Sequence, residues 1–318
     1  MGERQRVEIL KALWRDARVL ILDEPTAVLT PSEADELGRV TASMAEDGRS
    51  IIFISHKLDE VTAFCDEATV LRGGATVAAS LDVDDLDADR LAELMVGEAT
   101  AGEIVGIAGV AGNGQRPLAD AIAGLIPSTG SITILDQDLS SAKPSARNKA
   151  GLAYVPEDRI GVGLAPRLDV TENAIMRAYT SLSSGPIIDR SAAASHAEGL
   201  IEKFNVKIAK MTEPLAGLSG GNLQRLLVGR EVDGRPTVLI AAQPTRGLDV
   251  QGVAAIQEVL LAQAAAGVAI LLISEDLDEL LALSDRLLVM HEGAVVAEFE
   301  PDNTTRAQVG VAMTGAHA

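Results

Sequence analysis

A glycine-rich turn in the middle of the chain has the spacing of a loop that binds phosphate. The stretch GEIVGIAGVAGNGQRPLADAIAGL combines an apolar run, the spaced glycines Gly109, Gly112 and Gly114, and a helical pattern. Glycine lets backbone N–H groups close around phosphate oxygens, and the start of the helix then faces the anion. Gln115 and Arg116 replace the usual lysine and serine or threonine, so the amine and the hydroxyl that binds magnesium are absent. The alternative is a tight strand-to-helix turn that needs positive φ angles.

A second glycine-rich segment, LAGLSGGNLQR, lies at the start of another helical pattern. The hydroxyl of Ser219 and the free N–H groups beside it would suit the γ-phosphate of a nucleotide. The alternative is an ordinary helix N-cap, for which serine is a favoured residue, followed by flexible glycines.

Two further stretches share one frame but differ in their acidic residues. RVLILDEPTAVLT carries Asp23 and Glu24 directly after an apolar run that predicts a buried strand. TVLIAAQPTRGLDV has Ala242 and Gln243 at the equivalent positions, so it keeps the layout of a catalytic motif without the carboxylates. An acidic turn closed by proline is the alternative for the first stretch, but it does not explain why the frame occurs twice.

The two frames belong to an internal repeat, in which residues 2–74 align with residues 221–293 without a gap. Each copy contains a helix, a strand, a turn, a helix, a second strand, a short helix and a third strand. Strands that alternate with helices predict an α/β fold with a parallel sheet covered on both faces. Continuous apolar runs such as IIFIS are typical of strands buried on both sides.

Composition limits the classes of function. The chain has 318 residues, of which 47% are apolar, enough for one large or two medium domains. A formal net charge of −19, with no run rich in lysine or arginine, argues against a nucleic-acid partner. A single cysteine, Cys65, fits a reducing compartment. The sequence shows neither an apolar run long enough to span a membrane nor the layout of a signal peptide, so we expect a cytosolic chain.

Taken together, these motifs resemble the ATP-binding subunit of an ABC transporter. The phosphate loop, LSGGN, the strand-plus-turn frame, GLD and LLISEDLDEL occur in the order and spacing of that family. AYVPEDR, GNGQR, ISHKLDEV and GERQRVEILKAL are typical of the tandem subunits of sugar and nucleoside importers, which carry two ATP-binding domains in one chain. AAQPTRGLDV with LLISEDLDEL is most similar to the purine-nucleoside branch. The resemblance covers nearly the whole chain.

The resemblance implies that ATP and Mg²⁺ are ligands and that three residues of the first copy are catalytic. Asp23 would hold Mg²⁺ through water. Glu24 would polarise the attacking water as general base. His56, which would otherwise be a surface histidine, would contact the γ-phosphate and that water. In this family each nucleotide lies between the phosphate loop of one domain and the signature of the other, and LSGGN (residues 218–222) is the signature in this chain. The implied ATP-binding residues are Gly109, Gly112, Asn113, Gly114, Gln115, Arg116, Leu218, Ser219, Gly220, Gly221 and Asn222.

The equivalents of the three catalytic residues in the second copy are Ala242, Gln243 and Glu275. Gln243 cannot act as a base, and Glu275 places a negative charge where the γ-phosphate would lie. We therefore expect a degenerate site that is kept for shape and dimer contacts. Glu157 and Asp158 lie where the family couples ATP binding to its membrane subunits; an exposed acidic turn is the alternative.

The expected fold is α/β: a P-loop NTPase core of the ABC ATPase type with a helical subdomain, preceded by a partial copy of the same domain. Residues 1–97 would be the C-terminal half of a first ATP-binding domain. Residues 98–318 would be a second domain that lacks its opening antiparallel strands. We expect an N-terminally truncated chain that hydrolyses ATP poorly by itself, because the first phosphate loop is not in this sequence.

The implied function is the energy-coupling subunit of an importer for nucleosides or simple sugars, at the cytoplasmic face of the plasma membrane. Its partners would be membrane-spanning permease subunits and, indirectly, an extracytoplasmic substrate-binding protein. One alternative is a truncated relic or nucleotide-binding scaffold that does not hydrolyse ATP. Another is a soluble ABC protein outside transport, against which the net charge of −19 and the VPEDR motif argue.

Overall fold

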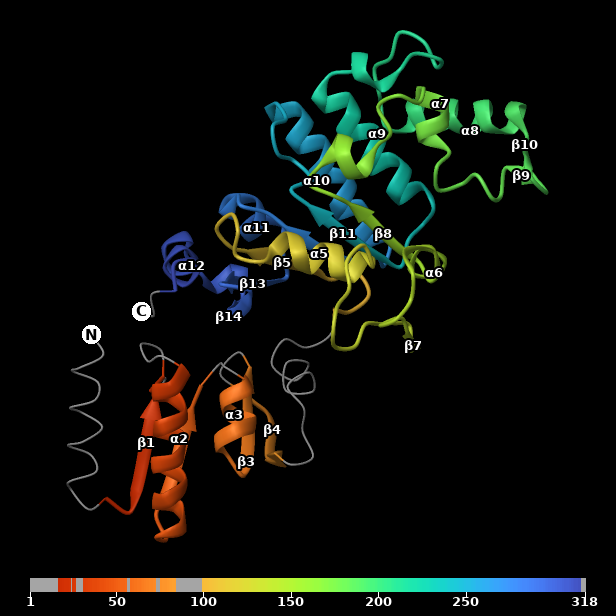
Figure 1. The fold of residues 1–318 in the computed structure, drawn as a ribbon. Coiled ribbons are helices and arrows are strands. Elements are labelled where there is room, and N and C mark those ends of the chain that lie inside the picture. Colours follow the sequence, from red (N-terminus) through yellow and green to blue (C-terminus); the bar gives the residue numbers. More distant parts are fainter. Residues whose placement is uncertain are drawn as a thin grey trace. The chain divides into compact units, whose positions relative to one another are not determined.

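The computed structural model describes residues 17–23, 25–26, 31–55, 58–72, 75–83 and 99–315. The chain divides into two compact units, Met1–Glu98 and Ala99–Ala318, which we call the first and second units (Figure 1). Within the described ranges, none of the helices combines the length and the apolar character needed to cross a bilayer.

The second unit is built on a six-stranded sheet with the order β14-β13-β5-β12-β11-β8. β13 and β14 pair antiparallel, whereas β13, β5, β12, β11 and β8 are parallel neighbours. The loops that follow these parallel strands therefore meet at one edge of the sheet, where ligands bind in open α/β folds. The strand bounds are β5 Ile104–Ala108, β8 Leu152–Val155, β11 Val238–Ala242, β12 Ala269–Ile273, β13 Arg286–His291 and β14 Ala294–Phe299.

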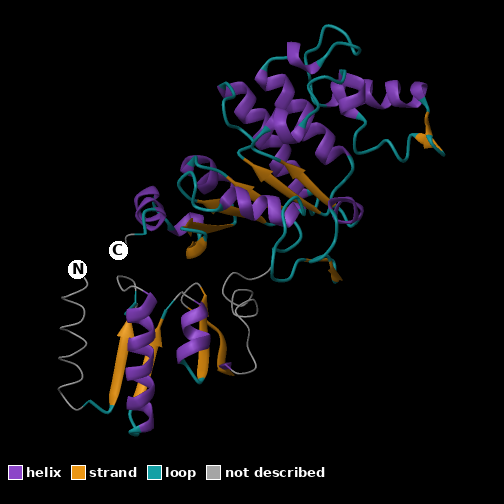
Figure 2. Cartoon of the chain, in the orientation of Figure 1, coloured by secondary structure: helices purple, strands orange, loops and turns teal. Residues whose placement is uncertain are grey.

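The central strands of this sheet are apolar along their whole length, because helices flank both faces (Figure 2). On one face α5 (Gln115–Ala123) contributes Ala119 to a core with Ile107 and Ile240. On the other face α9 (Gly220–Asp233) contributes Leu226 and Leu227 to a larger core. Because α5 follows β5 directly along the chain, the glycine-rich turn between them lies at the edge of the sheet where ligands bind in open α/β folds.

The remaining elements of the second unit are mostly short. The region between β8 and β11 is helical, and capping side chains define several of its ends: Asp169 forms a capping box with Glu172, and Asp189 accepts from two N–H groups of α8. The helices are α6 Pro144–Lys149, α7 Val170–Ala174, α8 Arg190–Lys203, α10 Val250–Ala265, α11 Leu277–Leu283 and α12 Arg306–Met313. The helical turns are η2 Arg159–Gly163, η3 Leu215–Gly217 and η4 Pro301–Asn303, and the short strands are β6 Thr133–Ile134, β7 Gln137–Asp138, β9 Ser183–Ser184 and β10 Ile187–Ile188.

The described residues of the first unit form two small sheets and two helices. β1 (Val19–Asp23) and β2 (Ser50–Ile54) are parallel, and Leu20 and Leu22 of β1 share a small core with Met44 of α2. β3 and β4 are antiparallel and form a second small core. The other bounds are α2 Pro31–Glu46, α3 Leu58–Phe64, β3 Glu67–Arg72 and β4 Ala75–Asp82.

Residues that are equivalent in the sequence repeat have equivalent strand pairing. Val19 pairs with Ser50 in the first unit, and their equivalents Val238 and Ala269 pair in the second. The β3–β4 and β13–β14 ladders also shift register at equivalent positions, after Val70 and after Val289. Equal register means that Asp23 and Ala242 end equivalent strands at the same point of the ladder.

Candidate functional site

The glycine-rich turn between β5 and α5 needs glycine at two positions. Gly112 and Gly114 have φ angles of 93° and 101°, in the left-handed region that other residues rarely adopt. Gly114 is the N-cap of α5, and no side chain caps the helix there. The first N–H groups of α5 are therefore available to an anion at the mouth of the loop.

The side chain of Gln115 folds back across this loop. It is 8% exposed, and its Nε2 donates to the Val110 carbonyl oxygen at 3.2 Å. A Cβ atom at Gly109 would collide with the Gln115 amide, so Gly109 makes room for this arrangement. Asn113 turns away from the loop mouth, because its Nδ2 donates to the carbonyl oxygens of Met290 at 3.3 Å and Met313 at 3.4 Å. The loop thus presents backbone N–H groups, not the side chains of Gln115 or Asn113.

A cavity of about 420 Å³ opens beside the loop, within the size range of small-molecule sites. Most of the sequence-predicted residues of the second unit come together on its wall. They are Gly112, Gly114, Gln115 and Arg116 from the loop and α5, Glu157 and Asp158 after β8, Ala242 at the end of β11, Gln243 after β11, and Glu275 after β12. Gly109, Asn113 and residues 218–222 do not line it.

Ion pairs and hydrogen bonds organise the polar wall of the cavity. Glu157 pairs with Arg246 of the turn after β11. Asp120 of α5 accepts from the Tyr154 hydroxyl at 2.9 Å and lies 3.7 Å from the Arg116 guanidinium. Burial, followed by the hydrogen bond to Asp120, raises the pKa of Tyr154, so this phenol stays protonated as a donor.

The signature segment caps the start of α9, as the N-cap interpretation of its sequence predicts. Ser219 is the N-cap; its Oγ accepts from the Asn222 N–H at 3.4 Å and from the Asn222 side chain at 3.0 Å. Asn222 in turn accepts from the Lys207 N–H at 2.8 Å. A Cβ atom at Gly221 would meet nothing within 4 Å, so space is open in front of this helix start. Leu218 packs against the larger core and anchors the segment.

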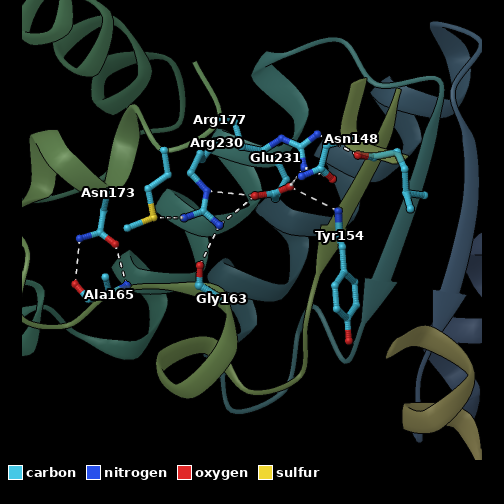
Figure 3. Close-up of polar contacts among 10 residues, drawn as sticks. Asn148, Tyr154, Gly163, Ala165, Asn173, Arg177, Arg230 and Glu231 are labelled. Atoms are coloured by element: carbon cyan, nitrogen blue, oxygen red, sulfur yellow. Dashed lines mark hydrogen bonds and ion pairs between the residues drawn. The ribbon is translucent and has the colours of Figure 1, made fainter. Parts of the chain in front are cut away.

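A buried charge network connects α9 to the cavity wall (Figure 3). Glu231 is 3% exposed and pairs with both Arg177 and Arg230 at 2.8 Å. It also accepts from the Tyr154 N–H at 3.3 Å, and the Tyr154 hydroxyl reaches Asp120 at the cavity. Arg230 donates to the Gly163 carbonyl oxygen at 2.8 Å, at the end of the turn that follows Glu157 and Asp158. The network therefore fixes the signature helix relative to the cavity wall.

Arg159, in the η2 turn, also connects this turn to the turn after β11 and to the start of α9. Its guanidinium donates to the Arg246 carbonyl oxygen, and it lies 3.5 Å from where a Cβ atom of Gly220 would be. Burial, and then the positive charge of Arg246, lower the pKa of Arg159. Asp158 fixes the start of the η2 turn by accepting from the Ile160 and Gly161 N–H groups at 3.2 and 2.7 Å.

In the first unit, Asp23 is the exposed last residue of β1, as the sequence predicts. Glu24 and His56 lie outside the described residues. Two residues near them in the sequence, Thr26 and Ser55, bind the same carboxylate. Glu60 of α3 accepts a hydrogen bond from the Thr26 hydroxyl at 2.6 Å and from the Ser55 hydroxyl at 3.2 Å. In the second unit Glu279 likewise accepts from Ser274 at 2.7 Å. Glu60 thus connects the segment after Asp23 to the end of β2.

Magnesium does not fit the cavity of the second unit. Arg116 stands where a hydroxyl ligand is needed, and Ala242 ends the strand where a carboxylate is needed. Across the part of the chain that the structure describes, no group of three or more His, Cys, Asp or Glu side chains is placed to hold a metal ion. An exposed aspartate such as Asp23 at the end of a strand does fit the oxygen chemistry of Mg²⁺.

Changing Gly114 to valine should weaken nucleotide binding at this loop at least about tenfold, because forcing a β-branched residue to a φ of 101° costs about 1–3 kcal/mol. A Cβ atom there would also lie 3.0 Å from the Gly293 Cα. Fluorescence titration with a mant-labelled nucleotide measures the effect. Gly199→Ala is the control, since a Cβ atom at this glycine of α8 meets nothing within 4 Å. Equal affinities for the Gly114→Val and Gly199→Ala chains would contradict a phosphate-binding loop.

No role follows from the sequence for several residues that shape the cavity. Arg246 and Tyr154 lie inside quoted motifs, but their partners Glu157 and Asp120 are far away along the chain. Glu231 and Arg177 lie in no motif at all. The only signal in the sequence is that a charged Arg-Glu pair, Arg230 and Glu231, interrupts the apolar positions of α9.

Comparison with known proteins identifies the family of this chain. A family model described as "ABC transporter" matches residues 1–27 and 95–246. The glucose import ATP-binding protein TsgD13 of Haloferax volcanii is 43% identical over 99% of this chain and 65% of its own length. The nucleoside import ATP-binding protein NupA of Lactococcus lactis is 38% identical over 99% of this chain and 71% of its own length. This chain therefore spans about two thirds of the length of these relatives.

Solved structures share the fold at lower identity. The ATP-binding cassette MJ0796, solved as a dimer in a post-hydrolysis state with ADP and Pi, gives a TM-score of 0.56 at 20% identity, over 64% of this chain and 88% of that chain. A structure described as the ATP binding subunit of an ABC transporter gives 0.56 at 21% identity, over 78% of this chain and 97% of that chain. These likenesses show the α/β fold of an ABC ATPase with a P-loop NTPase core, as the sequence predicts.

Proposed function

Because this chain belongs to the ABC transporter family, we propose that it is the ATP-binding, energy-coupling subunit of an importer for nucleosides or simple sugars. ATP hydrolysis would drive uptake through membrane-spanning permease partners, and an extracytoplasmic binding protein would deliver the substrate. The subunit would act at the cytoplasmic face of the plasma membrane. The names of relatives that match 99% of the chain, a glucose import and a nucleoside import protein, support this proposal.

The observation that carries the proposal is the cavity of the second unit. A glycine loop with two left-handed residues, an uncapped helix start, and the ends of three parallel strands meet there. This combination is how α/β folds bind the phosphates of nucleotides. Glu157 and Asp158 on the same wall are our candidates for coupling the nucleotide to the permease.

In the first copy, we propose that hydrolysis depends on Asp23, Glu24 and His56. Glu24 would accept a proton from the attacking water, and His56 would orient this water and the γ-phosphate. Asp23 would hold Mg²⁺, which when bound supplies positive charge that offsets the charge developing on the phosphate oxygens. In the second unit, Ser219, Gly220, Gly221 and Asn222 would contact a nucleotide through the open space before α9.

We also propose a division into residues 1–97, the rear half of one ATP-binding domain, and residues 98–318, a second such domain. Equal strand register in the two copies supports a duplication. The second domain would be degenerate, because Ala242, Gln243 and Glu275 replace the three catalytic residues. Among importers, the purine-nucleoside branch is our first choice on the motifs AAQPTRGLDV and LLISEDLDEL.

A labelled-uptake experiment tests this function. Cells that lack the gene should lose uptake of a nucleoside such as guanosine or of a simple sugar such as glucose, and the wild-type gene should restore it. The Asp23→Asn gene should not restore uptake, whereas the gene for Asp35→Asn, an exposed aspartate of α2, should. Unchanged uptake of both substrate classes in the deletion strain would contradict an importer for either class.

One alternative has a specific observation in its favour. In the second copy, Ala242 and Gln243 stand where the magnesium-binding carboxylate and the general base would lie, which fits a nucleotide-binding scaffold without turnover. Phosphate release by the purified full chain distinguishes the two functions. A scaffold would bind ATP without releasing phosphate, even when membranes containing the permease are added.

A further inference from the structure

The charges around the cavity of the second unit are unevenly distributed. Arg116 lies in the first turn of α5, next to the uncapped N–H groups that Gly114 leaves exposed, and its side chain is 62% exposed. A guanidinium at this position can bind phosphate oxygens through two hydrogen bonds. Positive charge and N–H donors therefore lie together on the loop side of the cavity.

Four carboxylates also line the cavity, and three of them are already engaged. Asp120, on α5 itself, accepts from Tyr154 and lies 3.7 Å from the Arg116 guanidinium. Glu157 pairs with Arg246, and Asp158 accepts from two backbone N–H groups. The fourth is Glu275, which follows β12; only its backbone N–H is held, by the Gln243 side chain at 3.4 Å.

Among the described residues, no cationic side chain forms an ion pair with the Glu275 carboxylate, and this exposed residue lines the cavity. A magnesium ion ordinarily offsets the charge of the terminal phosphates of ATP, but the residues of this cavity do not fit one. Any phosphate that extends beyond the loop towards β12 would meet the charge of Glu275 directly. Each additional phosphate would increase this repulsion.

We propose that the cavity of the second unit binds a nucleoside diphosphate in preference to a triphosphate, and binds it without a divalent metal ion. The loop N–H groups and Arg116 hold two phosphates, whereas a third phosphate is repelled by Glu275. This inference rests on the proposed function, because it assumes that the cavity is a nucleotide site. It makes the second unit a site that responds to the ratio of ADP to ATP instead of a second site of hydrolysis.

Calorimetric titration of the full chain with ADP and with ATP, each in excess Mg²⁺ and in EDTA, tests the proposal. The Gly114→Val chain identifies which binding belongs to this cavity, since that substitution blocks the loop. We expect ADP to bind there about tenfold more tightly than ATP, as one uncompensated like-charge contact implies. EDTA should change the affinity for ADP by less than about twofold, because no metal ligand is lost.

The Glu275→Gln chain then tests the cause of the preference. This substitution should raise the affinity for ATP about tenfold and leave the affinity for ADP unchanged, since only the third phosphate meets residue 275. Glu258→Gln on the exposed side of α10 is the matched control and should change neither affinity.

Three results would overturn the proposal in distinguishable ways. If neither nucleotide binds at the loop, the proposed nucleotide site itself fails. If both bind equally in the wild-type chain, or if Glu275→Gln has no effect on ATP, the site stands but the diphosphate preference fails. If Mg²⁺ strengthens ATP binding severalfold, a metal ion is held there and the metal-free part of the proposal is wrong.

Discussion

Replacing Glu24 with glutamine is expected to lower ATP hydrolysis by the full chain about 10²–10⁴-fold, the usual contribution of a general base. Glutamine keeps the size and the hydrogen-bonding atoms of the side chain but cannot accept the proton of the attacking water. Binding of ATP should be unchanged, so the loss should fall on kcat and not on KM. Steady-state phosphate release, with and without membranes that contain the permease, measures both quantities.

A matched glutamate in the same unit provides the control for this experiment. Glu36 is exposed on α2, and Glu36→Gln should leave the rate of phosphate release unchanged. If Glu24→Gln and Glu36→Gln hydrolyse ATP equally fast, Glu24 is not the base. If the wild-type chain itself binds ATP without releasing phosphate in either condition, the scaffold without turnover is the better description.

The contacts around Asp23 explain why the sequence alone predicts this chemistry only in outline. The apolar run before Asp23 predicts β1, and the structure confirms a strand that ends at this residue. The contact between Thr26 and Glu60 could not be predicted, because it depends on how α3 packs after β2. Spacing along the chain places carboxylates at the ends of strands, but it does not show which hydroxyl groups reach them.

The same limit applies to the loop of the second unit. The glycine spacing predicts left-handed backbone at the turn, and Gly112 and Gly114 have it. The direction of Asn113 and the folding back of Gln115 could not be predicted, because both depend on carbonyl groups brought near by β13 and by the loop itself. The sequence therefore predicts the backbone conformation of the glycine-rich loop better than the positions of the side chains that surround it.

Replacing Glu231 with alanine is expected to destabilise the second unit by about 3–5 kcal/mol, the usual cost of breaking a buried ion pair by removing one partner. Glu231 and Arg230 are 3% and 7% exposed, so water cannot replace the lost carboxylate. Arg177 and the Tyr154 N–H also lose a partner. Both tyrosines of the chain, Tyr154 and Tyr179, lie in the second unit, so urea unfolding followed by tyrosine fluorescence reports on it.

The control for this substitution removes the same side chain from the surface of a neighbouring helix. Glu202 is exposed near the end of α8, and Glu202→Ala should change the free energy of unfolding by no more than about 0.5 kcal/mol. A Glu231→Ala chain as stable as the Glu202→Ala chain would show that the buried network contributes little.

The double substitution Arg230→Met with Glu231→Leu separates two causes of the expected loss. If the loss comes from a charge left buried without a partner, removing both charges should restore part of the stability, since apolar residues of similar volume often replace a buried ion pair without cost. The coupling free energy would then be about 0.5–3 kcal/mol. If the double variant loses as much as the two single variants together, packing and the contact to Gly163 carry the effect instead. In either case nucleotide titration of the double variant shows whether the cavity needs the charges of this network or only its shape, because Tyr154 links the two.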